Sequence, residues 1–110
     1  MKRRLLSFKT RYRRARKFEI FIRDRLRECG FLVLDLDFWT GPVDLIAIDF
    51  KNRAVYFIEC KSGRGGLSRD KRIRISKFIE QFSKIMDKSW SSQFILLTKS
   101  NWSRVLSDIV

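Results

Sequence analysis

Two apolar runs separated by a short polar turn constrain the fold of this chain most strongly. Residues 43–50 and 54–60 are almost continuously apolar, and the residues between them are Lys51, Asn52 and Arg53. Short apolar runs bounded by polar turn residues are typical of buried β-strands. The three-residue connection is short enough to join them as a hairpin. The pattern therefore predicts a buried β-hairpin.

Charged side chains stand at one end of this predicted hairpin, where a core pattern would place apolar ones. Asp44 lies near the start of the first run, and Glu59 and Lys61 lie at the end of the second. Side chains alternate along a strand, so Glu59 and Lys61 share one face while Cys60 points to the other. The hairpin brings Asp44 opposite Glu59, and we predict that the two carboxylates meet at one edge of the sheet.

Two carboxylates held close together repel each other unless a cation compensates them. Mg²⁺ takes oxygen ligands and keeps several waters, and it can activate a water and stabilise charge on a scissile phosphate. Lys61 could orient that water or neutralise the transition state. A strand-end salt bridge between Lys61 and Asp44 or Glu59 is the alternative interpretation, and the residues alone favour neither.

An acid-x-Lys triplet is not specific in a chain so rich in Lys. Asp49-Phe50-Lys51 has the same pattern, but it falls at the predicted turn, where both charges can be solvated. The chain has no His, which excludes a Ser-His-Asp triad, a His-ligated metal and a histidine general base. Its two cysteines have neither redox nor zinc spacing, which indicates a reduced intracellular protein.

The net charge of +13 points to nucleic acid as the partner, because Lys and Arg contacts to phosphates release counterions. An anionic membrane surface is the less favoured alternative. Residues 1–17 carry nine basic residues and no acid, so we predict a single domain over residues 1–110 with a basic N-terminal arm over 1–17. No apolar run is long enough to span a membrane, and the start lacks the apolar segment of a secretory signal.

The remaining periodicities predict an α/β fold with the element order α-β-β-β-α-β-α. A helical stripe runs from about residue 10 to 29 and ends at Gly30. Strands are expected over 31–38, 43–50, 54–60 and 93–98, a basic loop over 63–74, and helices over 75–88 and 101–109.

Residues 41–47 (GPVDLIA) and 56–62 (YFIECKS) resemble the signature of the PD-(D/E)xK nuclease superfamily. Within it, residues 11–103 are most similar to archaeal and archaeal-viral Holliday junction resolvases. The resemblance implies a restriction-endonuclease-like αβββαβ core, with a mixed central sheet flanked by helices. It also implies Mg²⁺ or Mn²⁺, a homodimer, and paired nicks across a four-way DNA junction. The protein would act in the cytoplasm, at the nucleoid, or in a host cytoplasm if viral.

Carried over by position, the resemblance makes Glu19 the acid of the first helix, Asp44 and Glu59 metal ligands, and Lys61 the catalytic lysine. The Cys60 backbone carbonyl is a further predicted metal ligand, and Glu19 a possible one. The predicted DNA contacts are Arg11, Arg13, Arg14, Arg16, Lys17, Thr40, Arg64, Arg69, Lys71, Arg72 and Arg74.

The sequence also departs from the family pattern. Val43 precedes Asp44 where the family has Pro, and Gln81 falls too late for the family's second-helix glutamine. Two alternatives therefore stay open. One is a PD-(D/E)xK nuclease for flap, single-stranded or restriction-type DNA substrates, and the other is a non-catalytic nucleic-acid-binding module.

Overall fold

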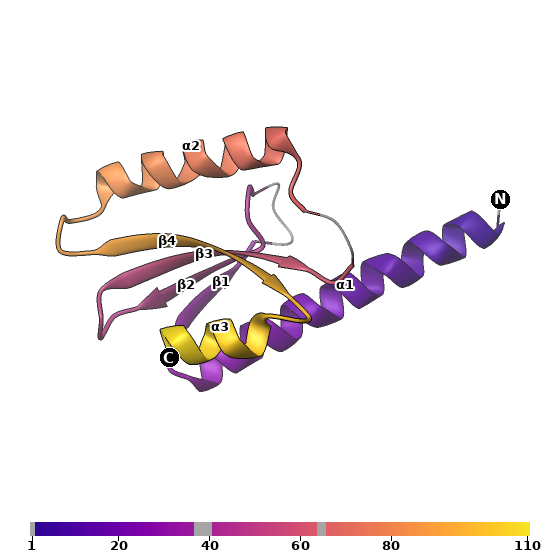
Figure 1. The fold of residues 1–110 in the computed structure, drawn as a ribbon, viewed down its shortest axis with the longest axis horizontal. Helices are drawn as coiled ribbons and strands as arrows, with labels where there is room; N and C mark the ends of the chain where they lie inside the picture. The colour runs from indigo at the N-terminus through magenta and orange to yellow at the C-terminus, as the bar shows by residue number, and fades with distance from the viewer. Residues whose placement is uncertain (1, 37–40, 64–65) are drawn as a thin grey trace.

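The computed structural model describes residues 2–36, 41–63 and 66–110, with the side chains of the first helix described from residue 13 onward. The predicted order of helices and strands is confirmed (Figure 1). The elements are α1 (Lys2–Glu28), β1 (Leu32–Asp35), β2 (Leu45–Asp49), β3 (Ala54–Lys61), α2 (Arg69–Ile85), β4 (Ser91–Thr98) and α3 (Trp102–Ile109).

The four strands form one mixed sheet in the order β1-β2-β3-β4. The first three pair antiparallel, whereas β4 runs parallel to β3 after the chain has crossed over through α2. Helices α1 and α3 cover one face of the sheet and α2 covers the other (Figure 1). The predicted α/β class, with a mixed central sheet flanked by helices, is thus confirmed.

The predicted hairpin between β2 and β3 is also confirmed, with Asp49 opposite Ala54 at its closed end. One carboxylate oxygen of Asp49 accepts hydrogen bonds from the backbone N–H groups of Lys51 and Asn52, both at 3.1 Å. Arg53 has a φ of 53°, the left-handed conformation that tight turns require. The triplet Asp49-Phe50-Lys51 therefore belongs to the turn, as its position in the sequence predicted.

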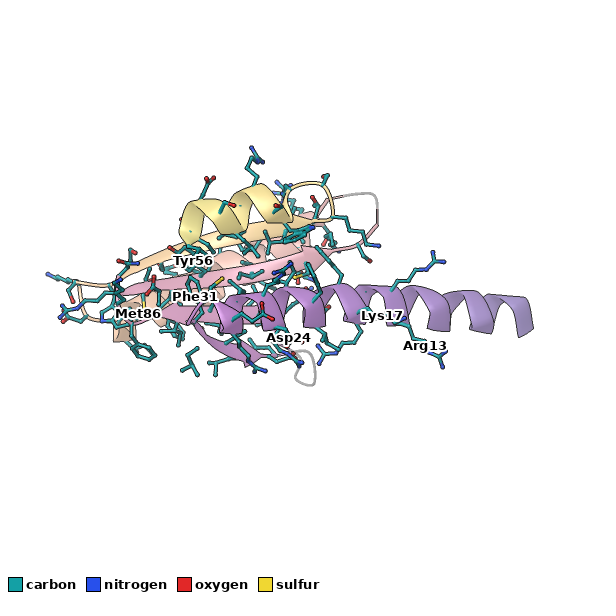
Figure 2. All side chains as sticks on the ribbon, turned by 90° about the horizontal axis from the view of Figure 1, so that it is seen from below. Arg13, Lys17, Asp24, Phe31, Tyr56 and Met86 are labelled. Carbon is teal, nitrogen blue, oxygen red and sulfur yellow. The ribbon has the colours of Figure 1, made fainter. Side chains whose placement is uncertain are left out.

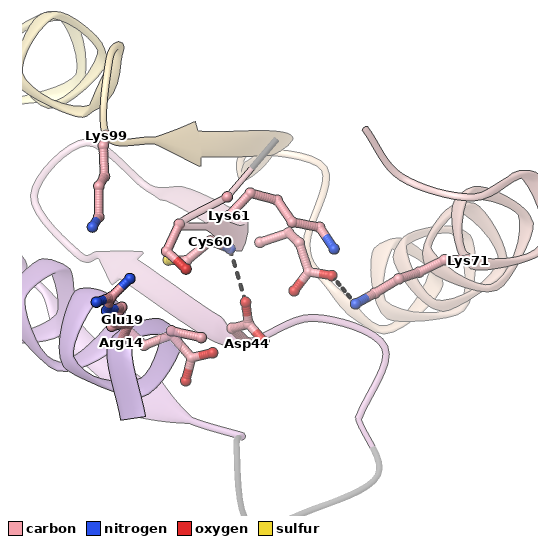
Figure 3. Close-up of a pocket in the computed structure, with 11 residues that line it drawn as sticks. Arg14, Glu19, Asp44, Cys60, Lys61, Lys71 and Lys99 are labelled. Atoms are coloured by element: carbon pink, nitrogen blue, oxygen red, sulfur yellow. Dashed lines mark hydrogen bonds and ion pairs between the residues drawn. The ribbon is translucent and has the colours of Figure 1, made fainter. Parts of the chain in front are cut away.

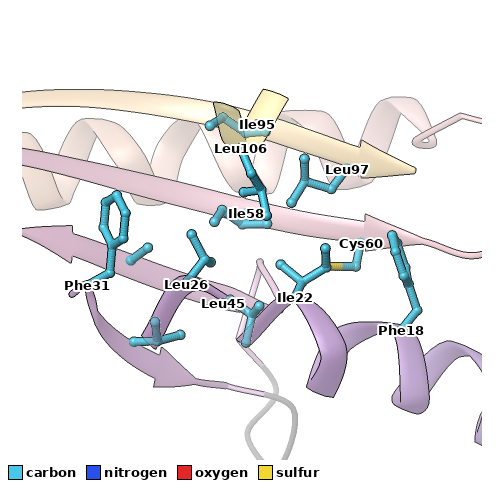
Figure 4. Packing of buried hydrophobic residues seen from close by; sticks show 12 residues of the cluster. Phe18, Ile22, Leu26, Phe31, Leu45, Ile58, Cys60, Ile95, Leu97 and Leu106 are labelled. Carbon is cyan, nitrogen blue, oxygen red and sulfur yellow. The ribbon is translucent and has the colours of Figure 1, made fainter. Parts of the chain in front are cut away.

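Side chains of the strands divide between two apolar clusters. On the α1 side, Ile22 and Leu26 pack with Leu45, Ile58 and Leu97, and all five are essentially inaccessible to solvent (Figure 4). Full burial of side chains of this size contributes about 1.5–3 kcal/mol each relative to exposure. This cluster ties the N-terminal helix to both central strands.

The second cluster lies between the sheet and α2. Phe57 of β3 makes edge-to-face contacts with Phe78 and Phe82 of α2, with ring centroids 5.7 and 5.2 Å apart. Because Phe57 faces α2 and Ile58 faces α1, alternation places Glu59 on the α2 side. Cys60 returns to the α1 cluster, as predicted.

Both long helices begin earlier than the sequence patterns predicted. Helix α1 starts at Lys2 rather than near residue 10, because Lys and Arg favour helix and no Gly or Pro interrupts residues 2–28. Helix α2 starts at Arg69 rather than near residue 75, because the Ser68 hydroxyl caps it by accepting from the Lys71 backbone N–H at 3.2 Å. The second half of the predicted basic loop, residues 69–74, is therefore helical.

The end of α1 agrees with its prediction. Gly30 follows the helix with a φ of 95°, a conformation that costs other residues free energy. The N-terminal half of α1 extends beyond the edge of the sheet (Figure 1). The basic segment over residues 2–17 is thus the first half of a continuous helix.

Candidate active site

Asp44 and Glu59 meet beside the ends of β2 and β3, as the hairpin pattern predicted. Asp44 directly precedes β2, and its backbone N–H donates to the carbonyl of Ile58 at 3.1 Å, which extends the strand pairing by one residue. Its carboxylate accepts a hydrogen bond from the backbone N–H of Cys60 at 2.8 Å (Figure 3). The Asp44 carboxyl also lies close enough to Glu59 for that acid to raise its pKa. The backbone of β3 thereby fixes the position of Asp44 beside Glu59.

Two carboxyl groups held close together in a partly buried site resist being ionised at the same time. The pKa of Asp44 is raised to about 8, chiefly by burial and next by the neighbouring carboxyl of Glu59. The negative charges of Glu59 and Glu19 add to this effect, while the Cys60 N–H opposes it. Without a cation, the pair therefore retains a proton at neutral pH.

Glu59 is the most deeply buried acid of the described chain, with 1% of its surface exposed. Its carboxylate forms an ion pair with the ammonium of Lys71 from the first turn of α2 (Figure 3). Apart from that ion pair, neither Glu59 oxygen has a hydrogen-bond partner among the described residues. An ionised carboxylate in such surroundings is costly unless more positive charge compensates it.

Glu19 reaches the same cavity from α1, as the family resemblance implied. It is 7% exposed, and Arg16 donates to its carboxylate at 3.1 Å. Arg16 also forms a bidentate pair with Asp35 of β1, at 3.2 and 2.8 Å. Arg16 thus bridges α1 and β1 beside the site, and its predicted DNA contact remains a prediction.

The side chain of Cys60 does not face the acids. It lies in the α1 cluster, and burial, together with the negative charge of Asp44, raises the pKa of its thiol well above the usual range. The thiol is therefore neutral and serves as a small apolar group. What Cys60 contributes to the site is its backbone, whose N–H positions Asp44.

These groups line a cavity of about 640 Å³ that opens between α1 and the first turn of α2. Basic and acidic side chains face each other across it, and Figure 3 shows Lys61, Lys71 and Lys99 around the acids. The charged lining residues are Arg14, Glu19, Asp44, Glu59, Lys61, Lys71 and Lys99.

Two of these placements were not predicted. Lys71 forms an ion pair with Glu59, which was not predicted, and its predicted DNA contact remains a prediction. Lys99 was not predicted to belong to the site at all. It follows β4, whose last residue, Thr98, lies beside Lys61. Because parallel strands end at the same edge of a sheet, the position of Lys99 just after the last strand was the signal that could have found it.

The oxygen-rich donor set fits a hard divalent cation. Asp44 and Glu59 supply carboxylate oxygens, which Mg²⁺ and Mn²⁺ prefer, and the two buried Glu59 oxygens lack donors. Mg²⁺ commonly binds through one or two carboxylates and keeps several waters. Among the described residues, no three His, Cys, Asp or Glu side chains converge as a ready metal cage. The fit is therefore to a largely hydrated ion held by the Asp44–Glu59 pair.

Other predicted DNA contacts lie on exposed helical surfaces. Arg13, Arg14 and Lys17 are exposed on α1, and Figure 2 shows Arg13 and Lys17 projecting from it. Arg69, Arg72 and Arg74 are exposed on α2. Thr40, Arg64 and the side chain of Arg11 lie outside the described residues.

A second cavity of about 470 Å³ adjoins the first through Lys71, which lines both. It runs along α2, and its other lining residues are Gly41, Pro42, Arg74, Lys77, Phe78 and Gln81. Lys71, Arg74 and Lys77 are three residues apart and so occupy one side of the helix. We call this cavity the α2 groove.

Comparison with known proteins gives one partial similarity. No family model matches the chain. A 40-residue stretch is 50% identical to a UPF0102 protein of Helicobacter hepaticus (strain ATCC 51449 / 3B1), and it covers 34% of each chain. The chain thus aligns with only about a third of that relative. Among the described helices, none is both long and apolar enough to cross a bilayer.

Proposed function

We propose that this protein is a metal-dependent nuclease that hydrolyses phosphodiester bonds in DNA. The observation that carries the proposal is the pair of half-buried Asp44 and buried Glu59, which shares a cavity with Lys61. A carboxyl pair that is short of hydrogen-bond donors favours a divalent cation. The surrounding Lys and Arg side chains favour a polyanionic substrate. Hydrolysis of a nucleic-acid backbone uses both features at once.

In this proposal each group of the site has a defined task. Asp44 and Glu59 hold Mg²⁺ or Mn²⁺, and the Cys60 carbonyl and Glu19 are further predicted ligands. When bound, such an ion supplies an activated water and neutralises charge on the phosphate. Lys61 orients the attacking water and stabilises the additional negative charge of the transition state.

The phosphate itself must be held while the bond is cut. Arg14 and Lys99 line the same cavity and are suited to contact the phosphates next to the scissile bond. The α2 groove extends the basic surface beyond the site, so that neighbouring phosphates have partners as well.

The 40-residue similarity to a UPF0102 protein supports a nuclease, because that family is related to the restriction-endonuclease-like nucleases. For the substrate, we propose a four-way DNA junction cut by a homodimer, which the family resemblance implies. A two-fold dimer matches the two-fold symmetry of a junction that receives paired nicks.

Cleavage of a substrate panel tests this function. The panel contains a four-way junction, a flap, a duplex and a single strand, each with Mg²⁺, with Mn²⁺ and with EDTA. We expect metal-dependent cleavage that Asp44→Asn and Glu59→Gln each reduce by at least about 10³-fold, with DNA binding retained. Glu80→Gln is the matched control, because Glu80 is an exposed acid on α2 away from the cavity.

The outcome of the panel discriminates between the alternatives. Paired symmetric nicks confined to the junction support the resolvase. Cleavage of flap, single strand or duplex instead supports a nuclease for another DNA substrate. Absence of metal-dependent hydrolysis on every substrate, with DNA binding intact, supports a non-catalytic nucleic-acid-binding module and contradicts the proposed function.

A further inference from the structure

Lys71 is the only side chain among the described residues that forms an ion pair with buried Glu59. Its side chain is 32% exposed, whereas that of Glu59 is 1% exposed. The backbone of Lys71 is held by the Ser68 cap, which fixes where the side chain starts. The ammonium therefore approaches Glu59 from a rigid first helical turn, through a flexible four-carbon chain.

This ammonium occupies a position that a metal ligand must have free. It contacts a Glu59 oxygen that has no hydrogen-bond partner among the described residues. A divalent ion bound to Glu59 needs the same oxygens, and it would lie close to the positive charge of Lys71. The divalent ion and the Lys71 ammonium would repel each other strongly, because charges beside buried Glu59 are poorly screened by solvent.

We infer that Lys71 is a built-in counter-cation that occupies Glu59 in the metal-free protein and competes with the divalent ion for it. This inference rests on the proposed metal-dependent function. The competition makes metal binding weaker than the two carboxylates alone would give. It also protects the fold from an uncompensated buried charge when the metal is absent.

The displaced ammonium has a place to go. Lys71 lines both the cavity of the acids and the α2 groove, where Arg74 and Lys77 extend along the same side of the helix. A side chain that leaves Glu59 can therefore turn into the groove and contact a phosphate there. Metal binding to the acids and contact of the DNA backbone with the α2 groove therefore favour each other. Lys71 is the positioning residue that couples them.

The test compares Lys71→Met with Lys84→Met. Both variants remove one positive charge from α2 and keep an unbranched side chain, but Lys84 is 72% exposed in the last turn and lies only near the exposed Glu80. Mn²⁺ affinity is measured by electron paramagnetic resonance without DNA, and Tm is measured in EDTA. We expect Lys71→Met to bind Mn²⁺ at least about tenfold more tightly than Lys84→Met. Its Tm in EDTA should be lower by about 5 °C or more.

A Mn²⁺ affinity of Lys71→Met that equals or falls below that of Lys84→Met would overturn the inference. If Lys71→Met does not fold without metal, folding in saturating Mn²⁺ is expected, and failure to fold there also counts against the competition. Lys71→Arg keeps the charge and should retain the wild-type Tm in EDTA and the weak Mn²⁺ affinity. Failure of the inference alone leaves a wild-type protein that binds Mn²⁺ and cleaves DNA. Failure of the proposed function leaves one that does neither.

Discussion

The carboxylate of Asp44 accepts a hydrogen bond from the backbone N–H of Cys60 at 2.8 Å, across the β2–β3 hairpin. The residue that supplies this N–H separates Glu59 from Lys61 along β3. Three consecutive residues of β3 therefore build the site. Glu59 supplies one acid, the Cys60 N–H positions Asp44, and Lys61 supplies the lysine. The geometry of the site is set by backbone pairing, which is more rigid than side-chain packing alone.

The raised pKa of Asp44 predicts how the metal-free protein responds to pH. Asp44 has an ordinary pKa of 3.8 and a pKa of about 8 in the folded protein, so the folded state binds its proton more tightly than the unfolded state. Stability is therefore greatest at low pH within this window and falls as pH rises from about 4 to about 8. Urea unfolding in EDTA between pH 5 and pH 8.5 measures the slope.

Asp44→Asn should remove most of that slope, because the amide does not titrate. Asp49→Asn is the control, since hydrogen bonds in the turn lower the pKa of Asp49 and its titration is complete below the window. Stability that is flat in the wild-type protein, or a slope that persists in Asp44→Asn, would contradict the assignment. The same proton must leave before a cation binds, so Mg²⁺ affinity should increase from pH 6.5 to pH 8.5.

Lys61 and Lys51 allow a direct comparison of two acid-x-Lys triplets. Lys61→Met should reduce the cleavage rate by about 10²–10³-fold, because a charge that stabilises the transition state is lost. Lys51→Met, in the hairpin turn, should leave the rate within about twofold. Single-turnover cleavage at saturating metal measures both. Equal effects of the two changes would place the catalytic charge elsewhere.

The α2 groove predicts a specific salt dependence of DNA binding. Arg74→Ala and Lys77→Ala should each weaken binding and lower the slope of log affinity against log salt by about 1, because each side chain is assigned one phosphate. Lys84→Ala removes a charge from the same helix outside the groove and should leave the slope nearly unchanged. Fluorescence anisotropy at several salt concentrations gives the slopes, and unchanged slopes for all three would exclude the groove as a phosphate track.

Substitutions of Arg16 and Arg13 compare the stability contribution of a partly buried, paired arginine of α1 with that of an exposed one. Arg16→Met should lower the free energy of unfolding by about 2–3 kcal/mol, because it leaves Asp35 and Glu19 short of a partly buried partner. Arg13 is exposed, and Arg13→Met should change stability by less than about 0.5 kcal/mol. Chemical denaturation checks both, and a small effect at Arg16 would mean that Arg23, which also pairs with Asp35, carries the contact.

The sequence predicted the part of the site that strand geometry determines. Period-two alternation put Glu59 on one face and Cys60 on the other, and the short turn brought Asp44 to Glu59. Glu19 could not be reached by this reasoning, because the packing angle of α1 against the sheet has no local signature. Only the family resemblance identified it as a member of the site.

The ion pair of Lys71 with Glu59 was not predicted for a related reason. A Lys in a basic segment normally points to solvent, and the apolar stripe of α2 begins only at Ile75. The Ser68 cap starts the helix six residues earlier than that stripe, which turns Lys71 toward the sheet. The start of α2 could be predicted from its capping residue, Ser68, but not from hydrophobic periodicity.

The alternation along β3 also makes correct folding and an intact site inseparable. A slip of β3 by one residue in its pairing with β2 would turn Glu59 into the cluster of Ile22, Leu26 and Leu45 and bring Cys60 to the cavity. A carboxylate enclosed by those aliphatic side chains would cost more free energy than a domain of this size can spare. Misregistered molecules should therefore unfold or be degraded rather than persist as inactive protein. The apolar core therefore ensures that only molecules with a correctly paired active site are stably folded.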